Sequence, residues 1–343
     1  MTAAQPAVAV DAMGGDHAPE ALVSGSLQAL ESDQGLRLVL VGPKERLQPL
    51  LPGLASAGAR LTLEESEEAI PMDAHPAQAA RHHPDSSVGV AVRLVRQGRV
   101  DACFSAGNTG AAMATALLQL KRRPGVARPA IGTRIPSRQG STLLVDSGAQ
   151  VDCRPEWLVQ FAELGCEYAR RALGVERPRV GLLSNGQETS KGNQLVQAAH
   201  ERLSQLDLAY VGPVEGIDLV SGAVDVVVCD GFVGNVALKT AEAVAELIVK
   251  ALRDEAGRGL RSRLGALLLL PGLRRLRQRL DWAQVGGAPL LGVGGLVYIG
   301  HGRSDARAVS SAVRVAAGAV RSGLAEAWRA ATEPVAVQPA SGG

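Results

Sequence analysis

Short runs of Val, Leu, Ile and Ala alternate along the chain with longer segments in which apolar residues recur every three or four positions. Short apolar runs bounded by Gly, Asn, Asp or Ser are typical of buried strands, and the longer spacing is typical of amphipathic helices. We expect strands at 8–11, 37–41, 60–63, 101–104, 141–145, 179–183, 207–211 and 225–229, and helices at 19–31, 86–98, 109–121, 155–173, 190–206, 234–255 and 305–330. This order predicts an α/β fold with a mostly parallel sheet flanked by helices.

The 343 residues show no internal repeat with a fixed period, and their composition is that of a globular chain, with 46% hydrophobic and 20% charged residues. We expect one α/β domain over residues 1–332. The tail at 333–343 is rich in Pro, Ala, Ser and Gly and is predicted to be disordered.

Charge and cysteine content narrow the class of protein further. Lys and Arg number 36 against 34 Asp and Glu, so the chain has no overall basic field of the kind that nucleic-acid binding requires. The four cysteines are far apart and no His lies at zinc-ligand spacing, which predicts reduced thiols and no metal site. The first residues lack the pattern of a signal peptide, and no apolar run reaches the ~20 residues of a spanning helix, so we expect a cytoplasmic protein.

Loops rich in Gly, Asn and Ser follow most of the expected strands. In a parallel sheet, ligands bind beyond the carboxyl ends of the strands, where free backbone N–H groups suit an anion such as phosphate. Any one such loop is more often a plain turn, but several at equivalent strand ends predict a shared site. The loops are 11–19, 105–111, 184–193, 230–235 and 286–295, the last of which leads to 300–304.

Familiar nucleotide and nucleophile motifs do not account for these loops. Lys191 follows Ser190, so there is no G-x-x-x-x-G-K-[ST], and neither G-x-G-x-x-G after the first strand nor G-x-S-x-G is present. ATP, NAD and a covalent serine nucleophile are therefore disfavoured, and we expect no cofactor. His17 has two open interpretations, a structural role at a helix start and a catalytic one.

The segment 250–282 differs from the rest of the chain. Between Lys250 and Leu280 it holds nine basic residues against Asp254 and Glu255, a net charge of +7, which leaves −5 for the remainder. Leucines surround a Pro-Gly break at 271–272, so the segment is predicted to form a basic amphipathic helical hairpin. Three partners remain open for it: an anionic membrane, a second copy of the chain, and an acidic protein.

Seven strings taken together closely resemble the bacterial phosphate acyltransferase family, the acyl-carrier-protein (ACP):phosphate transacylases of phospholipid synthesis. The resemblance runs from about residue 8 to about residue 324, and the chain departs from the expected pattern at Ser147, Gln150, Gln187 and Gly294. The strings are DAMGGDHAPE, SAGNTGAAM, RPAIGTRIP, VDCRPEWLVQFAELG, LLSNGQETSKGN, SGAVDVVVCDGFVGNVALKTAE and GGAPLLGVGG with IGHGRS.

The resemblance implies a fold like that of the phosphotransacetylases and the isocitrate/isopropylmalate dehydrogenases. It also implies a reaction in which inorganic phosphate takes the acyl group of acyl-ACP. The protein would act as a homodimer at the inner face of the cell membrane and supply a membrane glycerol-3-phosphate acyltransferase. Two other readings stay open, a non-catalytic phosphate- or lipid-binding scaffold and an isopropylmalate-type dehydrogenase.

The reaction assigns roles to candidate residues, because phosphate is itself the nucleophile and the protein must hold a dianion beside a thioester carbonyl. We expect catalytic roles for Lys191, Asn235, Asp230 and His17. Phosphate contacts are expected from Asn108, Thr109, Gly110, Arg128 and Asp16, with Arg134 as an alternative second cation. Membrane or ACP contacts are expected from Leu267, Leu268, Leu269, Leu270, Arg261, Arg263, Arg274 and Arg275.

Overall fold

The computed structural model of the chain describes residues 5–51, 58–259, 265, 268–269, 271–272 and 286–330. Their centre is an eleven-stranded sheet with the order β3-β2-β1-β4-β11-β10-β5-β6-β9-β7-β8. Seven strand pairings are parallel and three are antiparallel, which confirms the expected mostly parallel sheet. The strands are β1 Ala7–Asp11, β2 Arg37–Val41, β3 Leu61–Glu64, β4 Ala102–Ser105, β5 Ala130–Ser137, β6 Gly140–Val145, β7 Arg179–Leu183, β8 Ala209–Val214, β9 Val226–Val228, β10 Ala288–Leu291 and β11 Leu296–Ile299.

The three antiparallel pairings reverse the direction of half the sheet. β10 pairs antiparallel with both β11 and β5, and β5 pairs antiparallel with β6. β6, β9, β7 and β8 therefore run opposite to β1, β4 and β11. The loops after β1, β4 and β11 lie at one edge, here called the first edge, and those after β6, β9 and β7 lie at the opposite, second edge. This corrects the expectation that all the glycine loops meet at equivalent strand ends.

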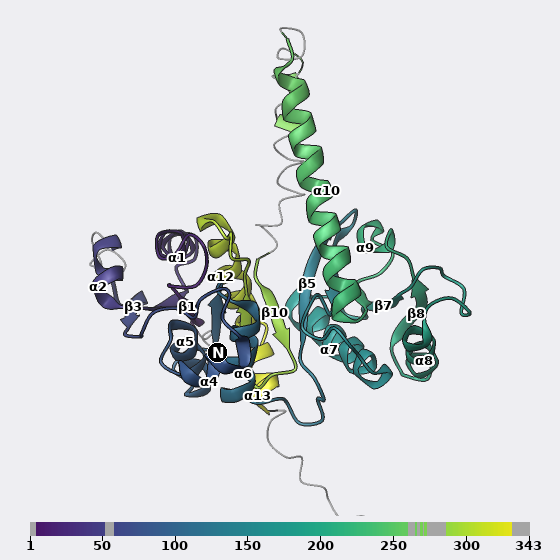
Figure 1. The fold of residues 1–343 in the computed structure, drawn as a ribbon, viewed down its shortest axis with the longest axis horizontal. Helices are drawn as coiled ribbons and strands as arrows, with labels where there is room; N and C mark the ends of the chain where they lie inside the picture. Colours follow the sequence, from purple (N-terminus) through teal and green to yellow (C-terminus); the bar gives the residue numbers. More distant parts are fainter. Residues whose placement is uncertain are drawn as a thin grey trace, which may run out of the picture.

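Helices cover both faces of the sheet (Figure 1). On face one, α1 and α12 pack together against β1, and α7 contacts β6, β9 and α12. On face two, α5 and α6 cover the first half, and α9 and α10 contact β6. The helices are α1 Glu20–Ser32, α2 Lys44–Leu47, α4 Pro76–His82, α5 Ser87–Arg96, α6 Thr109–Gln119, α7 Pro155–Leu173, α8 Gln194–Leu203, α9 Asp218–Ser221, α10 Gly231–Gly257, α12 Ala306–Arg321 and α13 Leu324–Ala330, with short 3₁₀ turns at Gln48–Leu50 and Gly58–Arg60.

The buried side chains form a continuous core on face one and a divided core on face two. Successive strand residues point to opposite faces, so Val8 and Val145 enter one cluster that spans both halves of the sheet. Ala9 enters a second cluster under α5 and α6, while Leu144 enters a third beside α10. The two halves therefore share a core only on face one.

Most expected elements are found within a few residues of their predicted ends, but β5, β10 and β11 were not expected. β10 and β11 have only four residues each and are flanked by glycines; β10 lies within the loop expected at 286–295, and β11 lies between that loop and the one at 300–304. β5 contains Gly132 and Pro136, which hide its strand pattern. The helix expected at 305–330 is divided into α12 and α13 because Gly323 has a φ of 76°.

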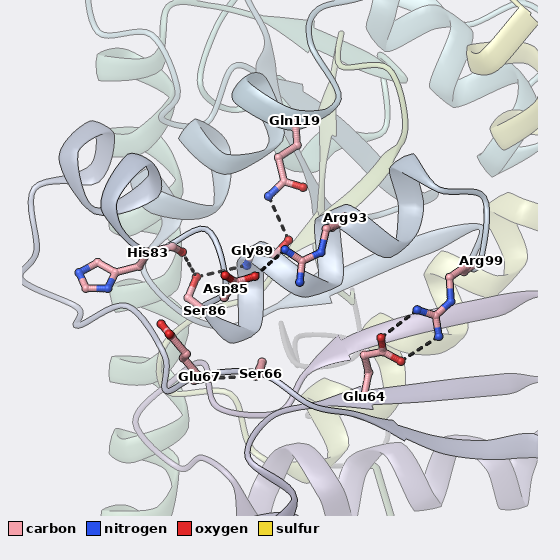
Figure 2. A network of polar contacts seen from close by, with 10 residues as sticks. All are labelled: Glu64, Ser66, Glu67, His83, Asp85, Ser86, Gly89, Arg93, Arg99 and Gln119. Carbon is pink, nitrogen blue, oxygen red and sulfur yellow. Dashed lines mark hydrogen bonds and ion pairs between the residues drawn. The ribbon is translucent and has the colours of Figure 1, made fainter.

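Polar contacts fix the start of α5 next to the sheet (Figure 2). Ser86 caps the helix by accepting a hydrogen bond from the N–H of Gly89 at 3.3 Å, and Gln119 of α6 donates to the carbonyl of the same glycine. Arg99, just after the helix, makes a bidentate ion pair with Glu64 of β3 at 2.8 Å. α5 is thereby held to both α6 and the outermost strand of the first half.

α10 is the longest of the described helices and projects far beyond the body of the sheet (Figure 1). Its 27 residues correspond to a length of about 40 Å. The first arm of the hairpin expected at 250–282 coincides with the end of α10, whereas most of the remainder, including Leu267, Leu270, Arg261, Arg263, Arg274 and Arg275, lies outside the described residues. The tail expected at 333–343 also lies outside them. Among the described helices, none is both long and apolar enough to cross a membrane.

Candidate active site

Asn235, one turn into α10, lies against the loop that follows β6. Its Nδ2 donates to the carbonyl oxygen of Ser147 at 3.3 Å, and the hydroxyl of Ser147 lies 2.7 Å from that of Thr133 on β5. Gly148 has a φ of 145°, and a Cβ there would lie 3.1 Å from the Asn235 amide nitrogen. This loop, β5 and α10 thus present amide and hydroxyl donors within one small region.

Asp146 holds that loop in shape. Its carboxylate is fully buried and accepts hydrogen bonds from the backbone N–H groups of Ile131, Gly148, Ala149 and Gln150 at 2.7–3.2 Å. Burial raises the pKa of Asp146, although these N–H groups favour its charged form. The side chain has no surface left for a ligand and acts by positioning the backbone beside Asn235.

Lys239, Glu242 and His301 form a charged cluster farther along α10. Asn235, Lys239 and Glu242 are spaced to lie on one face of the helix, and His301 comes from the loop after β11 at the first edge. Glu242 Oε2 lies 2.9 Å from Lys239 Nζ, Glu242 Oε1 lies 3.1 Å from His301 Nε2, and the two nitrogens are 3.4 Å apart. Burial alone would raise the pKa of Glu242, but hydrogen bonds from His301 and Lys239 outweigh it and hold that pKa at about 2.

The depressed pKa of Glu242 gives a stability prediction. Because the folded-state pKa lies below the ordinary value of 4.5, the carboxylate stabilises the fold above about pH 4.5, and this contribution is lost as the pH falls toward 2. Glu242→Gln should therefore cost about 1 kcal/mol at pH 7, a value that allows for solvent screening of its exposed partners. Urea unfolding of both proteins at pH 7 and pH 3.5 measures this. A gap between the two proteins that does not narrow in acid would show that the charge is not the stabilising feature.

At the first edge, the loops after β1, β4 and β11 are tied together. Buried Asp11 at the end of β1 accepts a hydrogen bond from Ser105 Oγ at 2.6 Å. The backbone N–H of Asp16 donates to the carbonyl of Gly302 at 2.8 Å. A cavity of about 830 Å³ lies beside this edge, between the Gly300–Ser304 loop and α10, and Glu242 and His301 are among its lining residues.

The side-chain amide of Asn108 is already used within the fold. Oδ1 caps α6 by accepting from the N–H of Ala111 at 3.0 Å, and Nδ2 lies 2.9–3.2 Å from the carbonyl oxygens of Pro71, Met72 and Ala74. The backbone N–H groups of Thr109 and Gly110, at the first turn of α6, are therefore the better donors to a phosphate there.

The structure divides the predicted site residues between the two edges. Asp16, His17, Asn108, Thr109 and Gly110 lie at the first edge. Asp230, Asn235, Lys191 and Arg128 belong to loops or helix starts at the second. α10 connects the two groups, because its first turn is at the second edge and Glu242 reaches His301 at the first.

Asp230, Arg128 and Lys191 at the second edge each make different contacts. Asp230 is the N-cap of α10 and accepts from the N–H of Val233 at 2.9 Å. Arg128 lies over the ring of Trp157, 5.0 Å from its centroid. Lys191 is exposed, and its described contacts stay within its own loop: its N–H donates to the carbonyl of Glu188 at 2.9 Å.

Glu242, Asp146 and Thr133 are not among the residues predicted from the sequence. Lys239 and His301 lie in segments expected there, the helix at 234–255 and the loop at 300–304, but no role was predicted for them. A signal was available for Glu242, since it lies seven residues after Asn235 and so recurs on the same face of the helix predicted there. Asp146 and Thr133 gave none, because their roles depend on the turn after β6 and on the unexpected strand β5.

The fold is similar to that of phosphotransacetylases. A phosphotransacetylase from Streptococcus pyogenes superposes with a TM-score of 0.62 at 18% identity over 92% of this chain and 94% of its own, and one from Staphylococcus aureus with a TM-score of 0.59 at 16% identity over 91% and 93%. This supports the phosphotransacetylase part of the expected fold; likeness to the isocitrate-type dehydrogenases stays a prediction.

Sequence comparison identifies the family. A family model described as "Fatty acid synthesis protein" matches residues 7–327. The Phosphate acyltransferase of Pelotomaculum thermopropionicum is 45% identical over 335 residues, 98% of this chain and 97% of its own, and that of Nostoc punctiforme is 48% identical over 316 residues, 91% and 92%. The chain belongs to the phosphate acyltransferase family.

Proposed function

We propose that this phosphate acyltransferase takes a fatty acyl group from acyl-ACP and transfers it to inorganic phosphate, giving an acyl phosphate for phospholipid synthesis. The observation that carries the proposal is the 45% identity to a phosphate acyltransferase across nearly the whole chain. The clustering of an amide, a cation and an imidazole–carboxylate pair along α10 supports it, since these are the groups that such a reaction needs.

The reaction makes one bond and breaks one. A phosphate oxygen attacks the thioester carbonyl carbon, the C–O bond forms, and the tetrahedral oxyanion collapses with loss of the carrier thiolate. The proton given up by the phosphate goes to the thiolate, so no oxidant or further reactant is needed. Burial raises the pKa of the Cys103 and Cys166 thiols, the latter to about 11, and this disfavours a competing cysteine nucleophile.

We propose a role in this reaction for each group. Asn235 donates to the oxyanion, and Lys191 and Lys239 supply positive charge for the phosphate. His301, oriented by Glu242, moves the proton. Asp230 fixes the start of α10, and further phosphate contacts are proposed for Thr109, Gly110, Arg128 and, through their loops, for Asn108, Asp16 and His17.

A homodimer is proposed from the surface of α10. Phe232, Val236 and Leu247 are 61%, 51% and 65% exposed, and Val236 and Leu247 line an open groove along the helix with Asn235 and Lys239. Apolar side chains exposed in this number along one helix are typical of an interface with another protein. A second copy packed there would cover them next to the site.

Peripheral membrane contact is proposed for the basic segment beyond α10, at the inner face of the cell membrane, where the acyl phosphate would reach a membrane glycerol-3-phosphate acyltransferase. Leu268 and Leu269 are 76% and 64% exposed. Leucines flanked by arginines insert into anionic membrane at shallow depth.

Replacing both Leu268 and Leu269 by Glu should abolish binding to vesicles that contain anionic lipid, because two carboxylates are repelled from the acyl region and the anionic surface. Turnover of acyl-ACP in solution should be unchanged. Flotation of both proteins with vesicles checks this, with Val151→Glu as the control at another exposed apolar side chain. Equal flotation of the double variant and the wild type would contradict the membrane proposal.

The function itself is tested by mixing purified protein with palmitoyl-ACP and phosphate and following free ACP and acyl phosphate trapped by hydroxylamine. Phosphate-dependent formation of both products is expected. Binding of acyl-ACP without turnover would instead indicate a scaffold, and an absorbance change with NAD would indicate a dehydrogenase.

A further inference from the structure

A cavity of about 880 Å³ lies on the surface between α6 and the loop after β6, and its charged lining residues are all cations. Lys121, Arg122 and Arg123 follow α6 directly, and Arg128 closes the same loop ahead of β5. We call this cavity the basic groove. The charge is local, since the chain as a whole carries only +2.

Three of these cations lack a carboxylate partner within the part of the chain that the structure describes. Arg123 is neutralised by Glu167 at 2.7 Å, whereas Lys121, Arg122 and Arg128 have no described ion pair. The Arg122 guanidinium donates to the carbonyl oxygen of Ala127 and so stays on its own loop. Positive charge held in place without a counter-charge attracts an anionic partner.

Four cations from one short stretch of chain line the same groove, and two of them are held by different neighbours. The Arg128 guanidinium lies over the Trp157 ring, and that of Arg154 is 5.9 Å from the centroid of the same ring. Arg122 is held by its hydrogen bond to the carbonyl oxygen of Ala127. Four cations along one groove suit a partner with several negative charges.

Apolar side chains accompany the charge. Met113 and Leu117 of α6 line the basic groove, and Leu118 and Val151, each next in sequence to a lining residue, are 48% and 58% exposed. Arg and Met beside a small apolar patch are enriched at the contacts between proteins. The partner that this surface fits is therefore an acidic protein with some apolar surface.

The basic groove adjoins the candidate active site through one residue. Gln150 lines it, donates from Nε2 to the carbonyl of Pro129 at 3.2 Å, and accepts from the N–H of Gly231 at 2.7 Å. Gly231 is the first residue of α10, four positions before Asn235. A protein bound in the groove would stand next to the turn that carries the proposed oxyanion donor.

We propose that the basic groove is the docking surface for the acidic carrier protein, which from there extends its acyl thioester past Gln150 to Asn235. The proposal rests on the proposed function, because it takes acyl-ACP as the donor. It places the carrier on the described body of the protein and leaves the arginine-rich segment beyond α10 for the membrane.

The test is a double variant, Lys121→Gln with Arg122→Gln, which removes two charges and keeps side-chain length. Neither residue has a role in the proposed chemistry. We expect the KM for acyl-ACP to rise roughly tenfold at low ionic strength, with kcat, the KM for phosphate and the turnover of an acyl-pantetheine thioester unchanged. The wild-type KM for acyl-ACP should rise with salt, and the variant should lose most of that dependence.

The matched control is Arg37→Gln with Arg314→Gln, which removes the same net charge from two exposed positions on β2 and α12. A KM for acyl-ACP within twofold of wild type in the groove variant, or an equal rise in the control, would overturn the proposal. A rise in the KM for phosphate alone would show instead that the groove holds the small anion and would also overturn it.

Direct binding keeps the docking proposal separate from the reaction. Fluorescence anisotropy of labelled palmitoyl-ACP needs no turnover, so it reports on docking even if the wild-type protein transfers no acyl group to phosphate. Weaker binding by the groove variant than by the control is expected. Equal binding by the two overturns the docking surface whatever the assay of the reaction shows.

Discussion

Replacing Lys191 by Ala is expected to lower kcat for acyl transfer to phosphate by roughly 10²–10³-fold, the size of effect seen when one preorganised oxyanion donor is removed. Lys191 brings the one positive charge to the 184–193 loop, whose other residues are Gly, Asn, Ser, Thr, Gln187 and Glu188. The fold should not change, because the bonds that shape the loop are made by other groups: Gly192 N–H donates to Asn185 Oδ1 at 2.8 Å, and the Lys191 backbone N–H donates to Glu188.

The measurement is kcat at saturating phosphate and acyl-ACP, with circular dichroism to verify folding. Lys44→Ala serves as the control, since Lys44 is an exposed lysine at the start of α2 with a surface ion pair to Glu65. Its activity should equal that of the wild type. Near-normal turnover by the folded Lys191 variant would remove this residue from the site.

The second large effect is expected at Asp146. Asp146→Ala leaves four backbone N–H groups without their acceptor, that of Ile131 on β5 and those of Gly148, Ala149 and Gln150 in the loop. Each such group costs about 1–3 kcal/mol when unpaired, with partial relief if water enters. We expect a loss of at least about 3 kcal/mol in the free energy of unfolding. Activity should fall as well, because the same loop supplies the Ser147 carbonyl that holds Asn235.

Urea unfolding measures the stability change. Asp146→Asn should lie between the alanine variant and the wild type, because its one remaining acceptor oxygen satisfies part of the loop. Asp33→Ala is the control: Asp33 also makes two close contacts, to Arg321 at 2.7 and 2.8 Å, but on the surface, where about 1 kcal/mol or less is expected. Similar losses at the two positions would show that the buried hydrogen bonds of Asp146 do not dominate.

The positions of most helices and strands could be predicted from the sequence, because a buried strand needs an apolar run and a surface helix an apolar stripe. The direction of the strands could not. It is decided by β5 and β10, whose Gly, Pro and polar residues conceal them, and by the antiparallel β5–β6 pairing. Without these two strands, the sequence wrongly predicts that all the loops lie at one edge of the sheet.

The sequence predicted which loops and residue types form the candidate site, but it did not predict the contacts between those residues. The loop residues around Asn235 and His301 were found because Gly, Asn and charged side chains stand out after apolar runs. The side-chain amide of Asn108 donates to carbonyl oxygens of residues 71–74. This contact could not be predicted, because that segment lies more than 30 positions away in the sequence. The pairing of Glu242 with His301 likewise joins residues 59 positions apart.

The hydrophobic core joins the two halves of the sheet on face one but not on face two. The two halves are bound together by the continuous cluster on face one, and on face two each half has its own. A rotation of one half relative to the other would therefore disturb fewer buried contacts on face two than on face one. Face two carries α6, α10 and Asn235, so a small rotation of one half would widen the approach to the acyl-transfer groups and leave the joint between the halves intact.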